Sequence, residues 1–112
     1  MAQTAYLDID QGSDFTAVFE LENDDNTPME LIGFTPYSQF RKSYNSTIAY
    51  QFVTQIVSET GGTISLHLSG ASSSAIKPGR YLYDVELVGP GNTKIRVIEG
   101  VVTINAEITK IP

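Results

Sequence analysis

One stretch decides the fold of this chain: Pro78-Gly-Arg-Tyr-Leu-Tyr-Asp-Val-Glu-Leu-Val-Gly-Pro-Gly-Asn-Thr-Lys-Ile-Arg-Val-Ile-Glu-Gly-Val-Val-Thr-Ile104. Its first apolar residues fall at every second position, at Tyr81, Tyr83, Val85 and Leu87. Because successive side chains of a strand point to opposite sides of the sheet, this spacing predicts a strand with one buried face. Gly89-Pro-Gly-Asn92 has the residues that tight turns need, so the stretch is predicted to be a β-hairpin.

The same alternation recurs along the rest of the chain. It is regular in Phe15–Leu21 and in Thr63–Ser69, and looser from Phe34 to Lys42 and from Ile48 to Val57. Turn residues separate these runs, and Gly70–Lys77 is the only segment in which we expect a helical turn. The pattern predicts an all-β fold, a seven- to eight-stranded antiparallel β-sandwich, with a small β-barrel as the alternative.

Two residues inside the predicted strands indicate irregularities. Pro36 has no amide hydrogen to donate to a neighbouring strand, so we expect a sheet edge or a bulge at that position. Gly100 is expected to mark a bulge that lets Val101–Ile108 change sheets.

The length of 112 residues predicts a single domain. Residues 15–112 are predicted to form the sandwich. Residues 1–14 carry few residues of the kind found in cores, and we predict that they form an N-terminal arm or an edge strand.

Composition narrows the class of protein. The apolar fraction of 41% is that of a globular domain, and the net charge of −6 argues against a general nucleic-acid binder or attachment to anionic membranes. The first ten residues lack the basic start and apolar run of a secretory signal, and no stretch has the roughly 20 apolar residues of a membrane helix. There is no cysteine, which fits folding in a reducing cytoplasm. We therefore expect a soluble protein with neither nucleic-acid nor membrane partners.

The sequence offers few residues for catalysis or metal binding. His67 is the only histidine, and it lies on the predicted polar face of its strand between Ser65 and Ser69. The loop Asn23–Asn26 lacks the glycine and the distal glutamate of a helix-loop-helix calcium site. We expect no enzyme activity, no cofactor and no metal. Tyr44 and Tyr50 leave open a sugar-binding platform, since aromatic rings stack on the apolar faces of sugars.

Four segments together resemble a known family. They are Gly33-Phe-Thr-Pro-Tyr-Ser-Gln-Phe-Arg-Lys42, Gly62-Thr-Ile-Ser-Leu-His-Leu-Ser69, Ile76-Lys-Pro-Gly-Arg-Tyr-Leu-Tyr-Asp-Val85 and Arg96-Val-Ile-Glu-Gly-Val-Val-Thr-Ile104. In this order they are similar to the small β-sandwich at the amino terminus of upper baseplate proteins of tailed phages. The resemblance runs from about Phe15 to Thr109 and is tightest at Gly79-x-Tyr-x-Tyr-Asp-Val85 and Ile98-Glu-Gly100.

The resemblance implies an Ig-like sandwich without catalysis that helps to hold a phage particle together. The expected role is a virion structural protein of the tail or baseplate, the neck or the connector. The alternatives are a capsid decoration protein, and an Ig-like or carbohydrate-binding module that contacts a host surface. The implied partners are other virion proteins and copies of the chain itself, in a homo-oligomer. The implied location is the virion, after synthesis in the host cytoplasm.

The chain ends at Pro112 without the helical or fibre regions that follow this domain in baseplate proteins. We therefore expect a free-standing tail, connector or decoration protein.

Two groups of residues carry predictions about assembly. Ala5, Tyr6, Leu7 and Ile9 are predicted to belong to an arm that contacts a neighbour, so that deleting residues 1–12 would weaken assembly but leave the domain folded. Arg41 and Asp84 are polar positions in otherwise apolar strands. We predict that they form an ion pair or contact a neighbouring subunit, the alternative being that both are simply exposed.

Overall fold

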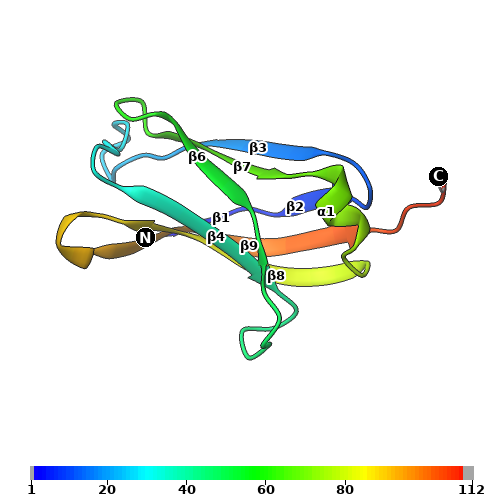
Figure 1. Ribbon diagram of the computed structural model, residues 1–112. Coiled ribbons are helices and arrows are strands. Elements are labelled where there is room, and N and C mark those ends of the chain that lie inside the picture. The colour runs from blue at the N-terminus through cyan, green and yellow to red at the C-terminus, as the bar shows by residue number, and fades with distance from the viewer. Residues whose placement is uncertain (1, 110–112) are drawn as a thin grey trace.

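The computed structural model describes residues 2–109 and shows a β-sandwich (Figure 1). The six-stranded sheet, here sheet A, contains β1 (Gln3–Thr4), β2 (Leu7–Asp10), β4 (Thr35–Arg41), β5 (Tyr50–Gln51), β8 (Gly79–Val88) and β9 (Lys94–Asn105). The three-stranded sheet, here sheet B, contains β3 (Phe15–Glu20), β6 (Val53–Ser58) and β7 (Thr63–Leu68). The predicted all-β sandwich is confirmed.

The strand order is that of an immunoglobulin-like sandwich. Sheet A runs β9-β8-β4 through its centre, and sheet B runs β3-β7-β6. The short helix α1 (Gly70–Ser74) joins β7 to β8, and the one-turn 3₁₀ helix η1 (Pro90–Asn92) joins β8 to β9. At the start of β8 the Tyr81 hydroxyl donates a hydrogen bond to the Lys77 carbonyl oxygen at 2.5 Å, which is the tyrosine corner of such folds.

The first two strands depart from the expected antiparallel arrangement. Both β1 and β2 run parallel to β9, and Leu7 lies opposite Val102. This pairing places Leu7 and Ile9 in the buried core between the sheets. Residues 1–14 therefore contain an edge strand of the same sandwich and not a free arm, and residue 15 is not a domain boundary.

Gly100 does not have the predicted role. β9 continues in sheet A to Asn105, and the register shift lies earlier, where Val85 and Glu86 face Ile98 and Arg96. A Cβ atom on Gly100 would collide with the carbonyl oxygen of Ala5. Glycine is therefore needed at this position because the connection between β1 and β2 passes directly against β9.

The chain changes sheets at Phe52, between β5 in sheet A and β6 in sheet B. The Phe52 amide donates a hydrogen bond to the Ser38 carbonyl oxygen at 3.1 Å, so this crossing is bonded to β4. β5 pairs with β4 only at Gln39 and Phe40, and Pro36 therefore lies where β4 forms the edge of the sheet. The prediction of an edge at Pro36 is confirmed.

The inner faces of both sheets meet in one apolar core, as the alternation predicts. Tyr81, Tyr83, Val85 and Leu87 are all buried, and so are Ile64, Leu66 and Leu68 on the facing sheet. Phe40 is fully buried at the centre, with its ring centroid 4.9 Å from that of Phe52 and 5.6 Å from that of Tyr81. Each such side chain contributes roughly 1.5–3 kcal/mol by leaving water. No helix in residues 2–109 is long and apolar enough to cross a membrane.

Candidate functional site

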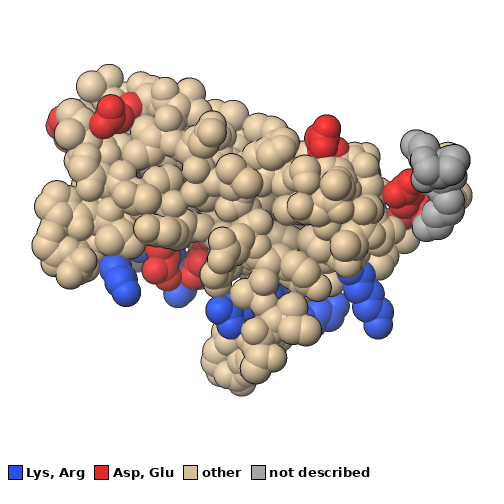
Figure 2. Space-filling view, viewed as in Figure 1, with Lys and Arg blue, Asp and Glu red and all other residues tan. Residues whose placement is uncertain are grey.

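Charged side chains are distributed unequally between the two sheets. The described lysines and arginines all lie in sheet A or next to its strands: Arg41, Lys42, Lys77, Arg80, Lys94 and Arg96. Residues 12–34 and 52–76, which include sheet B, contain acidic residues but no lysine or arginine. The blue side chains in Figure 2 accordingly gather along the side of the molecule where sheet A lies. The outer face of sheet A is thus the place to look for a polar site.

An open hollow of about 760 Å³ occupies this outer face. Its floor comes from β4, β8 and β9 and includes the partly exposed apolar side chain of Leu82. Residues 42–49 form a loop that projects from the face of the sheet (Figure 1), and Tyr44 in this loop lines the hollow. Tyr6, between β1 and β2, lines it from the other edge of the sheet. Tyr6 and Tyr44, which are far apart in the sequence, therefore line the same hollow.

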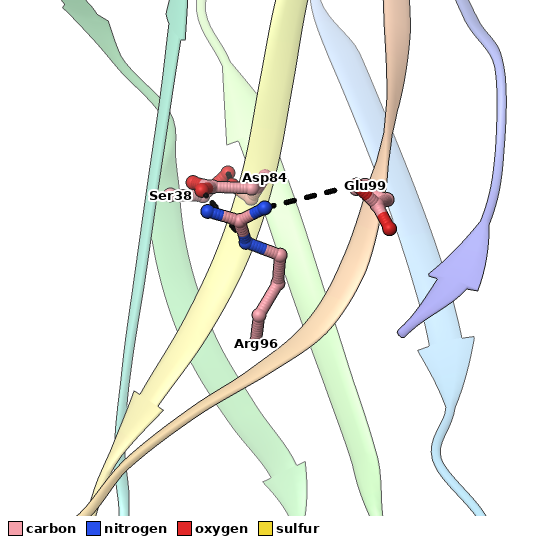
Figure 3. A network of polar contacts seen from close by, with 4 residues as sticks. All are labelled: Ser38, Asp84, Arg96 and Glu99. Carbon is pink, nitrogen blue, oxygen red and sulfur yellow. Dashed lines mark hydrogen bonds and ion pairs between the residues drawn. The ribbon is translucent and has the colours of Figure 1, made fainter. Parts of the chain in front are cut away.

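A polar network spans the floor of the hollow (Figure 3). Arg96 Nε lies 3.3 Å from Asp84 Oδ2, and Arg96 Nη1 lies 3.7 Å from Glu99 Oε2. Asp84 and Glu99 are directly opposite each other on β8 and β9, an arrangement in which like charges repel. Arg96 sits between the two carboxylates and compensates for this repulsion. On the inner side, Ser38 Oγ donates a hydrogen bond to the Asp84 carbonyl oxygen at 2.7 Å.

Asp84 is a carboxyl group of the hollow whose pKa is altered by its surroundings. Partial burial raises the pKa of Asp84 above its usual value, and the nearby Glu86 carboxylate raises it further. The positive charge of Arg96 acts in the opposite direction but does not cancel these effects. The carboxyl group of Asp84 therefore holds its proton more tightly in the folded protein than in the unfolded chain.

The predicted ion pair between Arg41 and Asp84 is not formed. Arg41 Nη1 instead donates a hydrogen bond to the Ser46 carbonyl oxygen at 2.7 Å, and its Nη2 donates one to Gln39 Oε1 at 3.1 Å. The register explains this, because Gln39 and not Arg41 lies opposite Asp84. Both Arg41 and Asp84 nevertheless line the hollow, and Arg41 ties the projecting loop to β4.

The actual partner of Asp84, Arg96, depends on a bulge. In a regular strand, residues 96 and 99 would point to opposite faces of the sheet. Here Val97 and Ile98 are both buried, and the register shift between Val85 and Glu86 returns both Arg96 and Glu99 to the outer face. Strict alternation could not have identified this pair. The available sequence signal was Arg96-Val-Ile-Glu99, in which two consecutive apolar residues separate two charged ones and so indicate a bulge.

The residues of the predicted arm divide between core and surface. Leu7 and Ile9 are buried, and Ala5 is partly buried, with its carbonyl oxygen accepting a hydrogen bond from the Tyr83 hydroxyl at 2.8 Å. Only Tyr6, with 74% of its surface exposed, is available to a partner. The segment is therefore built into sheet A, and Tyr6, together with Thr4 of β1, lines the hollow.

The two tyrosines of the sugar-platform alternative do not lie together. Tyr44 is 82% exposed and lines the hollow, whereas Tyr50 packs against Phe40, with ring centroids 5.3 Å apart. His67 lies on the outer face of sheet B, where its Nδ1 is 2.9 Å from Thr16 Oγ1. Within residues 2–109, no group of three or more histidine, aspartate or glutamate side chains is placed to hold a metal ion.

Comparison with known proteins places the chain in a family. The model of the LtfC-like, beta-sandwich domain matches residues 1–105, and this family is associated with phages. The curated proteins give no match. Among solved structures, the chain is similar to the Listeria monocytogenes internalin-like protein lmo2027, with a TM-score of 0.51 and 18% identity over 93% of this chain. The chain spans only 28% of that protein, and a likeness at this identity shows the fold alone. The family match covers nearly the whole chain, including β1 and β2, and the chain therefore belongs to the LtfC-like β-sandwich domain family.

Proposed function

We propose that this chain is a non-enzymatic structural domain of a phage particle, a component of the tail or baseplate, the neck or the connector. The observation that carries the proposal is the match to a phage-associated family over residues 1–105. The resemblance of four segments to upper baseplate proteins supports a place in the tail. The domain would be made in the host cytoplasm and act in the virion.

The surroundings of the polar residues support a role without catalysis. His67, which is the only histidine, bonds to Thr16 on an exposed sheet face and not in a cleft. A histidine that acts as a general base needs a nucleophile within hydrogen-bond reach and a site that excludes water. Arg96 pairs with both Asp84 and Glu99 on the floor of an open hollow, an arrangement suited to binding.

The edge of β3 supports assembly through backbone pairing. Within the described residues β3 pairs with β7 alone, so one edge of its six residues has no neighbouring strand. Soluble proteins commonly protect such edges with lysine, proline or a bulge, and β3 has none of these. The corresponding edge of β6 is attached to β4, because Thr54 Oγ1 donates a hydrogen bond to the Pro36 carbonyl oxygen at 2.8 Å. We infer that β3 accepts a strand from another virion protein or from a second copy of the chain.

The first experiment locates the chain. Particles made by the phage or strain that encodes it are purified and analysed by mass spectrometry, and an antibody against the chain is used for electron microscopy. We expect the chain to be present in fixed stoichiometry, with label on the tail or neck. Label on the capsid surface would favour a decoration protein, and absence from purified particles would refute the proposal.

A second experiment tests the edge. Val18 on β3 and Val53 on β6 are matched outward-facing valines of sheet B, 60% and 58% exposed. Val18→Lys should reduce incorporation into particles, since a lysine on an edge strand discourages pairing, while Val53→Lys should have little effect. Equal incorporation of both variants would show that β3 is not the assembly edge.

A further inference from the structure

We propose that the hollow on the outer face of sheet A binds an uncharged oligosaccharide. This inference goes beyond the structural role proposed above and does not rest on it. Three features of the hollow carry it: exposed tyrosine rings at both edges, a floor of planar polar groups held in place by one another, and a nearly even balance of charge.

The first feature is the pair of exposed rings. Tyr6 and Tyr44 are 74% and 82% exposed, and both line the hollow. Tyr6 lies between β1 and β2, beside β9, and Tyr44 lies in the loop after β4. Three interstrand spacings, about 14 Å in all, separate β1 from β4 across the sheet. Tyrosine rings stack on the apolar C–H face of a sugar ring while their hydroxyl groups stay in water. The partly exposed Leu82 between them provides an apolar surface on the floor.

The second feature is the polar floor. Arg96 is held by Asp84 and Glu99, and Arg41 is held by Gln39 and the Ser46 carbonyl oxygen. A carboxylate offers about four acceptor positions and a guanidinium five donors, which is more than these contacts occupy. Sugar hydroxyl groups both donate and accept hydrogen bonds, so they can bond to both kinds of group. Because the side chains are already oriented, little conformational entropy is lost on binding.

The third feature identifies the charge of the ligand. The hollow is lined by the carboxylates of Asp84, Glu86 and Glu99 and by the guanidinium groups of Arg41 and Arg96. These charges nearly cancel, so the hollow attracts neither a polyanion nor a polycation over distance. A phosphorylated or uronic-acid glycan would also place its anions beside three carboxylates. The geometry therefore points to a neutral sugar chain of a few residues.

The test uses the full chain labelled with nitrogen-15 and three neutral probes, maltotriose, cellotriose and chitotriose. Amide shifts in the nuclear magnetic resonance spectrum are followed during titration with each sugar. We expect at least one probe to shift the amides of residues that line the hollow. Trigalacturonate, an anionic probe of similar size, should bind at least about tenfold more weakly than the neutral sugar that binds.

Three variants separate the hollow from the rest of the surface. Tyr44→Ala and Tyr6→Ala should each weaken binding about tenfold, a loss of about 1.4 kcal/mol. Tyr37→Ala is the matched control, because Tyr37 is also an exposed tyrosine of sheet A, at 58%, but does not line the hollow. Circular dichroism checks that each variant is folded, which is expected for changes at exposed side chains.

Two results would overturn the proposal. One is the absence of amide shifts with all three neutral sugars at about 10 mM, beyond the weak end of specific binding. The other is an affinity that Tyr44→Ala and Tyr37→Ala reduce equally. If no sugar binds and Tyr44→Ala instead lowers incorporation into particles, the hollow is a protein-docking surface and the sugar proposal is wrong. That outcome would leave the structural role intact, so the two proposals fail separately.

Discussion

The two sheets of this sandwich are alike on their inner faces and different on their outer faces. Inside, both present apolar side chains at every second position to a common core. Outside, sheet A carries an ionic network in a hollow, whereas the middle strand of sheet B presents the uncharged row Thr63, Ser65 and His67. Packing constrains only the inner positions. The outer positions are not constrained by packing, so the difference between the two outer faces indicates what each sheet contacts outside the domain.

The edges of the sheets differ as well. In sheet A, β2 is anchored to β9 by a run of paired residues and by two buried side chains. In sheet B, the edge of β3 has no neighbouring strand within the described residues. An edge strand that belongs to the core is part of the domain, whereas an unpaired edge is available to a partner.

Deleting residues 2–10 should have the largest effect, because it removes the anchored edge of sheet A. Loss of burial at Leu7 and Ile9 alone should cost about 4 kcal/mol or more of unfolding free energy, a large share of the roughly 5–15 kcal/mol that stabilises a typical domain. Urea denaturation followed by circular dichroism measures this. A truncated protein within about 1 kcal/mol of the full chain would show that these strands are an appendage after all.

Gly100→Ala should have the next largest effect on stability. This substitution tests how closely the edge of sheet A is packed. The new methyl group would meet the Ala5 carbonyl oxygen, and relieving this collision should cost about 1–3 kcal/mol. The control on sheet B is Ser65→Ala in the middle strand, where we expect a change below about 0.5 kcal/mol. Equal melting temperatures for the two variants would contradict the close approach described for Gly100.

The pH dependence of stability should distinguish an acid of sheet A from an acid of the loop after β3. The pKa of Asp84 is raised from 3.8 by burial first, so its stabilising contribution is complete below pH 3.8 and is lost as pH rises through the raised pKa. The pKa of Asp25 is lowered from 3.8, chiefly by the hydrogen bond from the Thr27 hydroxyl, so its contribution is present above pH 3.8 and is lost as pH falls.

Asp84→Asn should therefore gain stability relative to the unchanged protein as pH rises from 3.8 through the raised pKa of Asp84, whereas Asp25→Asn should lose relative stability as pH rises through the lowered pKa of Asp25 to 3.8. Both effects should be small, because Asp25 is fully exposed and Asp84 partly so. Thermal unfolding of the two variants across this range measures them. Slopes of the same sign for both would mean that the surroundings of Asp84 are not as described.

The smallest effects are expected on the outer face of sheet B. Thr16→Val removes the exposed hydrogen bond to His67, and Val18→Thr replaces an exposed valine by a residue of equal shape. Each should change the unfolding free energy by less than about 0.5 kcal/mol. A loss of more than about 1 kcal/mol in thermal melts would show that this face contributes to stability, which would contradict the difference described between the two sheets.

Local periodicity was enough to predict which faces are buried. Tyr81 to Leu87 and Ile64 to Leu68 lie in the core as their alternation indicates, because neighbouring side chains of a strand must point to opposite sides. The helical turn before Pro78 and the sheet edge at Pro36 likewise follow from the chemistry of single residues. These features depend only on residues close together in the chain.

Contacts between distant segments were decided by the tertiary structure alone. A bulge in β9, invisible to strict alternation, brings Arg96 and Glu99 to the same face and gives Asp84 a partner other than Arg41. The sequence predicted that Leu7 and Ile9 belong to an arm, but parallel pairing of β2 with β9 places both side chains in the core. The sequence alone determined the sandwich and its buried faces, because the period of two is local. Strand register across the sheets determined the hollow and its ion pairs, because register depends on how the whole chain packs.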